Sequence, residues 1–513
     1  MVTLINGSDA RRWWALASVS LAVLAVSLDG TVLSVALPTL VTAMHASQTD
    51  LEWFSAGYLL ALAATVLPAG MLGDRGGRKK LLVVSLALFG LGSAACAFSP
   101  TPAAFLAARV LLGVAGAGVT VMAMSALTVL FDTAERPKAV GVFAAANFVA
   151  LPLGPILGGW MLTQFWWGTL FLINVPVVIL GLTAVAFLVP ETRGEQGRRV
   201  DLVGITTSAV GLVGVTAGLV LAGQDGWNSI AAWSVIVAGV ALIVAFFFWE
   251  RRLTRLARDP LVDMALFSSP SFTWGSVLAG VAGLALIGVI FTMPQYFQGV
   301  QGADAFGSGL RLLPLIGGLI LGAVPANKLS DRIGSRFTIA LGFALLVLGF
   351  AVGAMTEVAS PIWFTATWMA VTGAGAGIAL AAATSAALSN LTVDESGIGS
   401  GVVQAIQKVG APLGTTVLGS VVTVTYQASV GVSALPWRIA EQVRHSLFAG
   451  VGVAEASRSS ALLDSVRSAF VDGVDRALLV SAGIAVVGCI VAVIFIPRST
   501  TSPTRNEVPV AAS

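Results

Sequence analysis

The sequence predicts an all-α polytopic membrane protein with about fourteen transmembrane helices. Its composition is 57% hydrophobic and only 10% charged, and its mean hydropathy is +0.92. Soluble domains carry about 25% charged residues, so this chain lacks the polar side chains that a water-facing surface needs. The apolar residues also form long uninterrupted blocks, and most basic residues lie in the short segments between those blocks.

The apolar blocks define the predicted helices. About 18 or more apolar residues are enough to cross a hydrocarbon core of about 30 Å as a helix, whereas a barrel shows alternating segments of about ten. The first block follows Arg11 and Arg12, but it is too long for a signal peptide and contains Asp29, so we expect a retained helix. The blocks lie near residues 13–37, 53–72, 81–99, 103–127, 139–161, 169–189, 202–222, 230–249, 272–294, 308–326, 337–356, 362–387, 400–426 and 475–496.

Loop charges predict the orientation, because short cytoplasmic loops are enriched in lysine and arginine. With both termini in the cytoplasm, the short outer loops hold no basic residue, and the only basic outer segment is 427–474, which is long enough to be exempt. We therefore expect an even helix count and both termini in the cytoplasm. The cytoplasmic segments then hold Arg11, Arg12, Arg75, Arg78, Lys79, Lys80, Arg136, Lys138, Arg193, Arg198, Arg199, Arg251, Arg252, Arg255, Arg258, Lys328, Arg332, Arg336, Arg498 and Arg505.

A repeated loop motif predicts two related halves. Residues 70–78 read GMLGDRGGR after the second block, and residues 328–336 read KLSDRIGSR after the tenth. Internal repeats of this kind are typical of transporters in which one helix bundle rocks against another. The predicted domains are a six-helix bundle over 1–190, a two-helix insertion with its linkers over 191–270, a six-helix bundle over 271–496 and a cytoplasmic tail over 497–513.

The long segment 427–474 is not a low-complexity linker. Its apolar and charged residues, from Trp437 to Phe448, follow a helical period. This pattern predicts a short amphipathic hairpin on the outer face of the membrane. We favour a structural cover, although a gating or binding role stays open.

Five motifs in order carry a family resemblance. They are LDGTVLSVALP at 28–38, the loop at 70–80, LAARVLLGVAGAG at 106–118, LGPILGG at 153–159 and FLINVP at 171–176. With these motifs the chain resembles the major facilitator superfamily over nearly its whole length, and within it the fourteen-helix drug:proton antiporters. The resemblance implies a major facilitator fold of two six-helix bundles plus two central extra helices, and it implies proton-driven export of drugs.

Asp29 is the predicted proton-coupling residue. Among 25 acidic residues it alone lies deep inside an apolar block, where a charge costs about 2.5–3.5 kcal/mol and marks a functional candidate. Arg109 is its expected partner, because both residues lie about 9–12 Å below the outer surface at 1.5 Å per residue. The resemblance also links the fourth-helix arginine to proton transfer. A packing role for Asp29 and a structural role for Arg109 are the alternatives; Arg311 and Lys408 are further candidates, each nearer the end of its predicted helix.

The repeated loop is the predicted conformational latch. Its glycines permit a tight turn and close helix approach, and its carboxylate can pair with cytoplasmic arginines or cap a helix. Topology anchoring is a second role for its basic residues, and no strand or Walker pattern supports a phosphate loop. The latch residues are Gly70, Gly73, Asp74, Arg75, Gly77, Arg78, Asp331 and Arg332.

A glycine-proline motif interrupts the fifth predicted helix at Gly154, Pro155, Gly158 and Gly159. Proline removes a backbone hydrogen bond, and small residues let neighbouring helices touch. The resemblance implies an antiporter motif typical of exporters, and ordinary glycine-mediated packing is the alternative.

The substrate pocket has the weakest signal in the sequence. Polar and aromatic side chains inside predicted helices are candidates to line it, namely Asn147, Tyr296, Phe297, Trp368 and Gln404. The ninth to thirteenth predicted helices contain no acidic residue in their membrane part, which argues against the recognition of dications.

Other function classes find no support in the sequence. There is no nucleotide-binding loop, no nucleophile elbow and no metal-ligand cluster, so we expect no enzyme, no cofactor and no metal, and transport driven by the proton gradient. The expected partners are lipophilic cationic or neutral small molecules, protons and membrane lipids, not nucleic acid, and we expect a monomer in a bacterial plasma membrane. A solute importer on the same fold and a receptor or scaffold built on 427–474 are the competing hypotheses.

Overall fold

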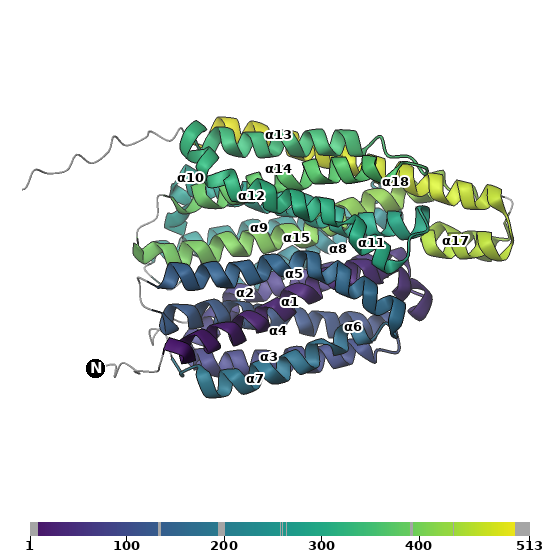
Figure 1. Ribbon diagram of the computed structural model, residues 1–513. Coiled ribbons are helices and arrows are strands. Elements are labelled where there is room, and N and C mark those ends of the chain that lie inside the picture. Colours follow the sequence, from purple (N-terminus) through teal and green to yellow (C-terminus); the bar gives the residue numbers. More distant parts are fainter. Residues whose placement is uncertain are drawn as a thin grey trace, which may run out of the picture.

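The computed structural model describes residues 9–131, 135–192, 201–256, 258, 260–262, 264–389, 393–433 and 435–497, and every regular element in these residues is a helix. The helices run side by side as one long bundle (Figure 1). Their bounds are α1 Asp9–Met44, α2 Gln48–Gly76, α3 Arg78–Ala97, α4 Pro102–Leu130, α5 Arg136–Gln164, α6 Thr169–Leu172, α7 Asn174–Leu188, α8 Leu202–Asp225, α9 Ile230–Arg255, η1 Met264–Ser268, α10 Pro270–Gln295, η2 Tyr296–Val300, α11 Ala305–Arg311, α12 Leu313–Ile333, α13 Ser335–Gly353, α14 Ile362–Leu388, α15 Val393–Ser429, α16 Trp437–His445, α17 Leu447–Ala456 and α18 Ser460–Phe495.

Within the described residues, twelve helical segments are long and apolar enough to cross a membrane. The helices α2 and α5 are not among the twelve, although each has 29 residues and covers one of the predicted blocks. The all-helical membrane architecture is therefore confirmed, and the count of fourteen stays a prediction.

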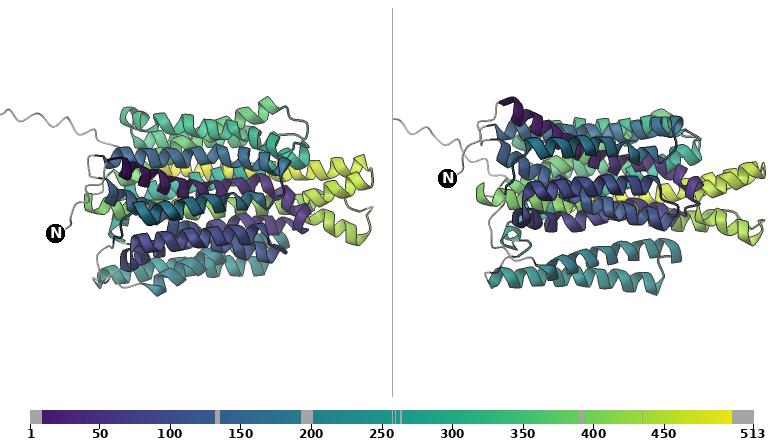
Figure 2. Two further views of the ribbon diagram at one scale, coloured as in Figure 1. Left: turned by 60° about the horizontal axis from the view of Figure 1, so that its bottom comes forward. Right: turned by 90° about the horizontal axis from the view of Figure 1, so that it is seen from below.

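Two hydrophobic cores divide the bundle. One core consists almost wholly of buried side chains from α1 to α7, and the other of buried side chains from α10 to α18. The insertion between them packs as a pair, α8 against α9, and α8 also contacts α2 of the first half and α15 of the second. Seen from below, this pair lies to one side of the other helices (Figure 2, right).

The two ends of the bundle differ. The helix α1 begins and α18 ends at the same end, which we call the terminal end. At the other end α16, α17 and the first turns of α18 project beyond the remaining helices, and we call it the hairpin end (Figures 1 and 2).

The predicted loop 427–474 is largely helical, and its predicted bounds were too wide. The helix α15 continues to Ser429, and α18 begins at Ser460, where the side chain of Ser459 caps it by accepting a hydrogen bond from the backbone of Leu462. Hydropathy misses these turns because they carry charged residues, whereas a helix needs only its backbone bonds and a cap. The side chain of Phe448 in α17 packs against both cores, so this segment joins the two halves.

The halves touch at the hairpin end and separate towards the terminal end. Trp14, Leu21, Leu28 and Val35 recur every seven residues and so lie on one face of α1. Val35 is fully buried in the core of the second half, whereas Leu21 is 36% and Trp14 67% exposed. On this face the second half therefore covers α1 at the hairpin end and leaves it uncovered near the terminal end.

Polar contacts between the halves also gather at the hairpin end. The amide of Gln48 donates to Gln295 over 3.1 Å, and the amide of Gln298 donates to the carbonyl of Val35 over 3.1 Å. Because these contacts cross between the two cores, they must break if the hairpin end opens.

Candidate functional site

A buried ion pair lies at the centre of the first half. The Arg109 guanidinium on α4 donates from Nη1 to Asp29 Oδ2 on α1 over 2.5 Å, and the two side chains are 1% and 0% exposed. The structure thus brings together the two residues that the sequence predicted for proton coupling. An ion pair removed from water is stable only when its geometry is good and its remaining polar atoms are satisfied.

Neighbouring helices satisfy those remaining atoms. Arg109 Nε donates to the carbonyl of Phe54 over 3.2 Å, and its guanidinium carbon lies 4.3 Å from the ring centre of Tyr58, which favours the cation. The Asn174 amide on α7 bridges Asp29 Oδ1 and Ser93 Oγ, at 3.4 and 3.3 Å. Five helices, α1 to α4 and α7, therefore hold this pair.

Sequence reasoning missed part of this network. It placed Asn174 in a motif without a role, and it did not single out Tyr58 or Ser93. A tyrosine and an asparagine inside apolar blocks could have drawn attention to these positions. The sequence does not show which residue on another helix a single polar side chain contacts. Asp29 and Arg109 stood out because a full charge at depth is far more costly than a neutral amide or hydroxyl.

The glycine-proline motif of α5 makes two close helix contacts. A side chain at Gly154 or Gly158 would collide with Thr31 or Val32 of α1. A side chain at Gly159 would lie 2.5 Å from the carbonyl oxygen of Ala305 in α11. Gly154 and Gly158 thus seat α5 on α1 within the first half, while Gly159 lets α5 meet the second half.

The repeated loop forms the same turn in both halves. Gly77 joins α2 to α3 with φ of 113°, and Gly334 joins α12 to α13 with φ of 84°. Such backbone angles favour glycine, which explains why both copies of the motif retain one at this position. Asp331 and Arg332, in the second copy, are exposed at the terminal end.

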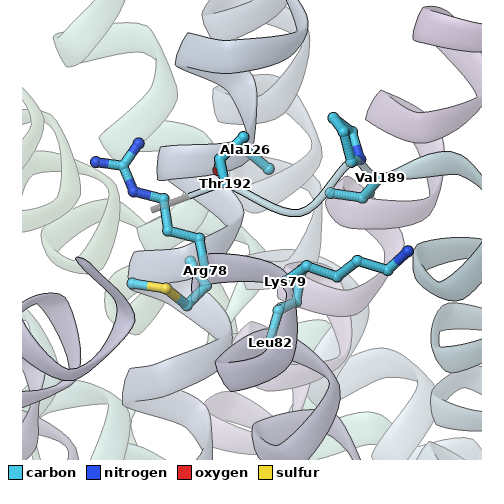
Figure 3. Close-up of a pocket in the computed structure, with 8 residues that line it drawn as sticks. Arg78, Lys79, Leu82, Ala126, Val189 and Thr192 are labelled. Atoms are coloured by element: carbon cyan, nitrogen blue, oxygen red, sulfur yellow. The ribbon is translucent and has the colours of Figure 1, made fainter. Parts of the chain in front are cut away.

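The first copy of the loop is held by the segment after α7. Glu191 accepts a hydrogen bond from the backbone of Lys79 over 3.1 Å, and its carboxylate occupies the space where a side chain on Gly77 would lie. The backbone of Arg78 donates to the carbonyl of Thr192 over 2.9 Å. Figure 3 shows Arg78, Lys79 and Thr192 lining a small hollow at this junction.

The other latch residues vary in their surroundings. Gly73 packs against Met122 of α4, a Cβ added at Gly70 would lie 3.7 Å from Val121, and Arg75 is exposed. The side chain of Asp74 lies outside the described residues. The latch role of this loop stays a prediction.

The predicted substrate residues do not form one cluster. Tyr296 and Phe297 begin the π-helical turn η2 at the hairpin end, where both are fully buried. Trp368 is also buried, and its ring packs against Gly353 of α13. Gln404 on α15 is exposed, and the side chain of Asn147 lies outside the described residues.

Three buried acids lie outside the predicted site. Glu52 is 2% exposed and accepts a hydrogen bond from Thr423 of α15 over 3.0 Å, so it joins the two halves. Glu250 and Asp201 both lie close to Gly204 at the terminal end of the insertion, where the Trp249 indole donates to Asp201 and the backbone of Val262 donates to Glu250, each over 3.0 Å. Sequence reasoning placed all three at block edges, because hydropathy cannot show what a neighbouring helix covers.

Two helical bundles, the first of which holds a buried ion pair, are typical of membrane transporters built from two related halves. The chain belongs to the Major Facilitator Superfamily, whose profile matches residues 19–202 and 192–415. This confirms the superfamily resemblance that the sequence motifs suggested.

Curated relatives cover nearly the whole chain. The tetracenomycin C resistance and export protein of Streptomyces glaucescens is 29% identical over 100% of this chain and 96% of its own length. The multidrug efflux pump LfrA of Mycolicibacterium smegmatis is 32% identical over 95% of this chain and 99% of its own. The methyl viologen resistance protein SmvA of Salmonella typhimurium is 31% identical over 90% and 93%.

Solved structures show the same fold. A bacterial homologue of the human lysosomal transporter Spinster, in an inward-facing and unoccupied conformation, superposes with a TM-score of 0.68 at 14% identity, covering 95% of this chain and 97% of that one. The nucleoside transporter NupG superposes with a TM-score of 0.61 at 11% identity, covering 94% of this chain and 100% of that one.

Proposed function

We propose that this protein is a proton-coupled exporter of lipophilic, neutral or cationic drugs in a bacterial plasma membrane. The observation that carries this proposal is the buried pair of Asp29 and Arg109. The resistance and efflux functions named for relatives that span the whole chain support drug export. The high content of small apolar residues and arginine agrees with a bacterial source.

The pair suggests how protons and drug are coupled. In the ionised pair each charge neutralises the other, so the bundle tolerates both at depth. A proton arriving at Asp29 would remove the negative charge and free Arg109 from it, which changes the energy of the packed helices around them. A rearrangement of the halves would then release drug to the outside.

The remaining features support alternating access. We infer that the terminal end faces the cytoplasm, because the short loops there carry the basic residues. Drug would enter from the cytoplasm or inner leaflet through the accessible terminal end, and the contacts at the hairpin end would break to let it leave. We expect a monomer that works in membrane lipid without cofactor or metal and has no enzymatic activity.

Everted membrane vesicles test this proposal. Adding ethidium or a panel of lipophilic antibiotics to vesicles with a preformed proton gradient should dissipate that gradient, because export into the vesicle lumen returns protons. The Asp29→Asn variant should lose this response while reaching the membrane at a normal level. No dissipation with any compound, or full activity of Asp29→Asn, contradicts the proposal, and uptake in the opposite direction indicates an importer.

A further inference from the structure

We propose that Lys408 binds the acidic group of an exported drug, so that the substrates of this transporter include lipophilic acids. This inference rests on the export function proposed above and adds a substrate class to it.

Lys408 lies far from either end of its helix. It is about 22 Å along α15 from Val393 and about 31 Å from Ser429, at 1.5 Å per residue. The predicted block 400–426 placed Lys408 near its start, and α15 begins further upstream, at Val393. The apolar span within α15 begins at Val402, so Lys408 lies about 9 Å inside that span at 1.5 Å per residue.

The neighbours of Lys408 fix the direction of its side chain. Gln407 donates to Thr384 of α14 in the second half over 2.8 Å. Val409 packs against an apolar cluster formed by Leu60 and Ala63 of α2 and Leu212 of α8. Successive helix residues point about 100° apart, so Lys408 points between these two contacts, towards the boundary between the halves.

Exposure along this face of α15 decreases from the terminal end towards the hairpin end. Gln404, one turn nearer the terminal end, is exposed; Lys408 is half-buried; and Ala411, nearly one turn further in, is only 7% exposed. The face of α1 marked by Trp14, Leu21 and Val35 shows the same decrease. Lys408 thus lies between the exposed part of this face, near the terminal end, and its buried part. A molecule that enters from the terminal end would reach Lys408 before the buried part.

The ammonium group lacks a counter-charge. Within the described residues it makes no hydrogen bond and no ion pair. The buried acids of the two halves have other partners, since Asp29 is bound by Arg109 and Glu52 by Thr423. A half-buried cation without an acidic partner is partly desolvated, and a ligand that supplies the opposite charge offsets that cost.

The surroundings match a lipophilic acid. The ammonium is a compact charge with three donors and no fixed plane, so it can pair with a carboxylate or a phenolate in several orientations. The amide of Gln404 offers a hydrogen bond one turn away, and the neighbouring Val409 adjoins the apolar cluster that includes Leu60 and Ala63 of α2. A flat aromatic acid would bury its rings there and its charge at Lys408.

Matched ligand pairs test the inference in everted vesicles. The probes are planar aromatic carboxylic acids, including nalidixic acid, each with its methyl ester, and ethidium as the cationic reference. Wild-type vesicles should accumulate at least some of the acids. Lys408→Gln should lower acid accumulation at least about tenfold and change ester and ethidium accumulation by less than about twofold, because only the acid loses a charge partner.

Lys408→Arg is the matched control, because it keeps the charge and should retain most acid accumulation. Ethidium export by each variant shows that the protein is folded and active. Equal loss of acid and ester in Lys408→Gln, unchanged acid export in that variant, or no acid export by a wild type that exports ethidium each overturns the inference. If the wild type exports none of the probes, the export function itself fails.

Discussion

At the scale of single residues, the pair of Asp29 and Arg109 is the feature that the sequence predicted and that the structure contains. A sequence of this hydropathy makes a charge at depth conspicuous, and helix geometry puts the two charges at similar depth. The sequence could not show that Asn174 and Ser93 complete the pair, since hydrogen bonds between residues far apart in the chain depend on helix rotation. The same limit hid the contact between Glu52 and Thr423.

Removing one member of the pair should be more harmful than removing both charges. Arg109→Gln leaves Asp29 buried without its cation and should lower the free energy of unfolding by about 3–5 kcal/mol. Adding Asp29→Asn removes the uncompensated charge and should recover a large part of that loss without restoring transport. Thermal unfolding of the purified proteins in detergent measures both effects. A double variant no more stable than Arg109→Gln would show that the pair does not couple the two residues.

At the scale of elements, glycines position the helices. The predicted latch loop forms a turn that only one of its adjacent glycines requires. Gly77 has a positive φ and lies against the Glu191 carboxylate. Gly76 is the last residue of α2, and a Cβ added to it would meet no other atom within 4 Å. The motif alone cannot distinguish these two glycines, because the difference depends on the turn and on a segment more than 110 residues away.

The Gly77→Ala and Gly76→Ala variants should therefore differ in stability. The first forces a side chain into an unfavourable backbone region and against Glu191, and it should cost about 1–3 kcal/mol. The second replaces glycine in a helix with a better helix former and should be neutral or stabilising by up to about 1 kcal/mol. Thermal unfolding and membrane expression of the two variants provide the comparison. Equal destabilisation would mean that the positive φ at Gly77 is not required in the folded protein.

At the scale of the whole molecule, the contacts between the halves define a state closed at the hairpin end. Gln48 and Gln295 face each other across that boundary at 3.1 Å, and Gly159 permits a second contact between α5 and α11. Export by alternating access requires these contacts to break and re-form in each cycle. The protein's motion should therefore be blocked by a covalent link at this end.

Cysteines at positions 48 and 295 test that requirement. In a background with Cys96→Ala and Cys489→Ala, a short bifunctional thiol reagent should link Gln48→Cys to Gln295→Cys and abolish drug-dependent dissipation of the proton gradient. A reducible linker should restore activity after reduction. Each single cysteine variant, treated identically, is the control. Full transport by the linked protein would show that the hairpin end does not need to open.

Local patterns in the sequence were enough to predict the membrane class, the helical fold, the repeat and the charges at depth, Asp29 and Arg109, because hydropathy and loop charge are local properties of the chain. The packing of the helices was needed to show which residues face the boundary between the halves, which end is closed, and that Lys408 has no partner among the described residues. These features depend on how helices distant in sequence rotate and pack against each other. No local pattern along the chain contains that information.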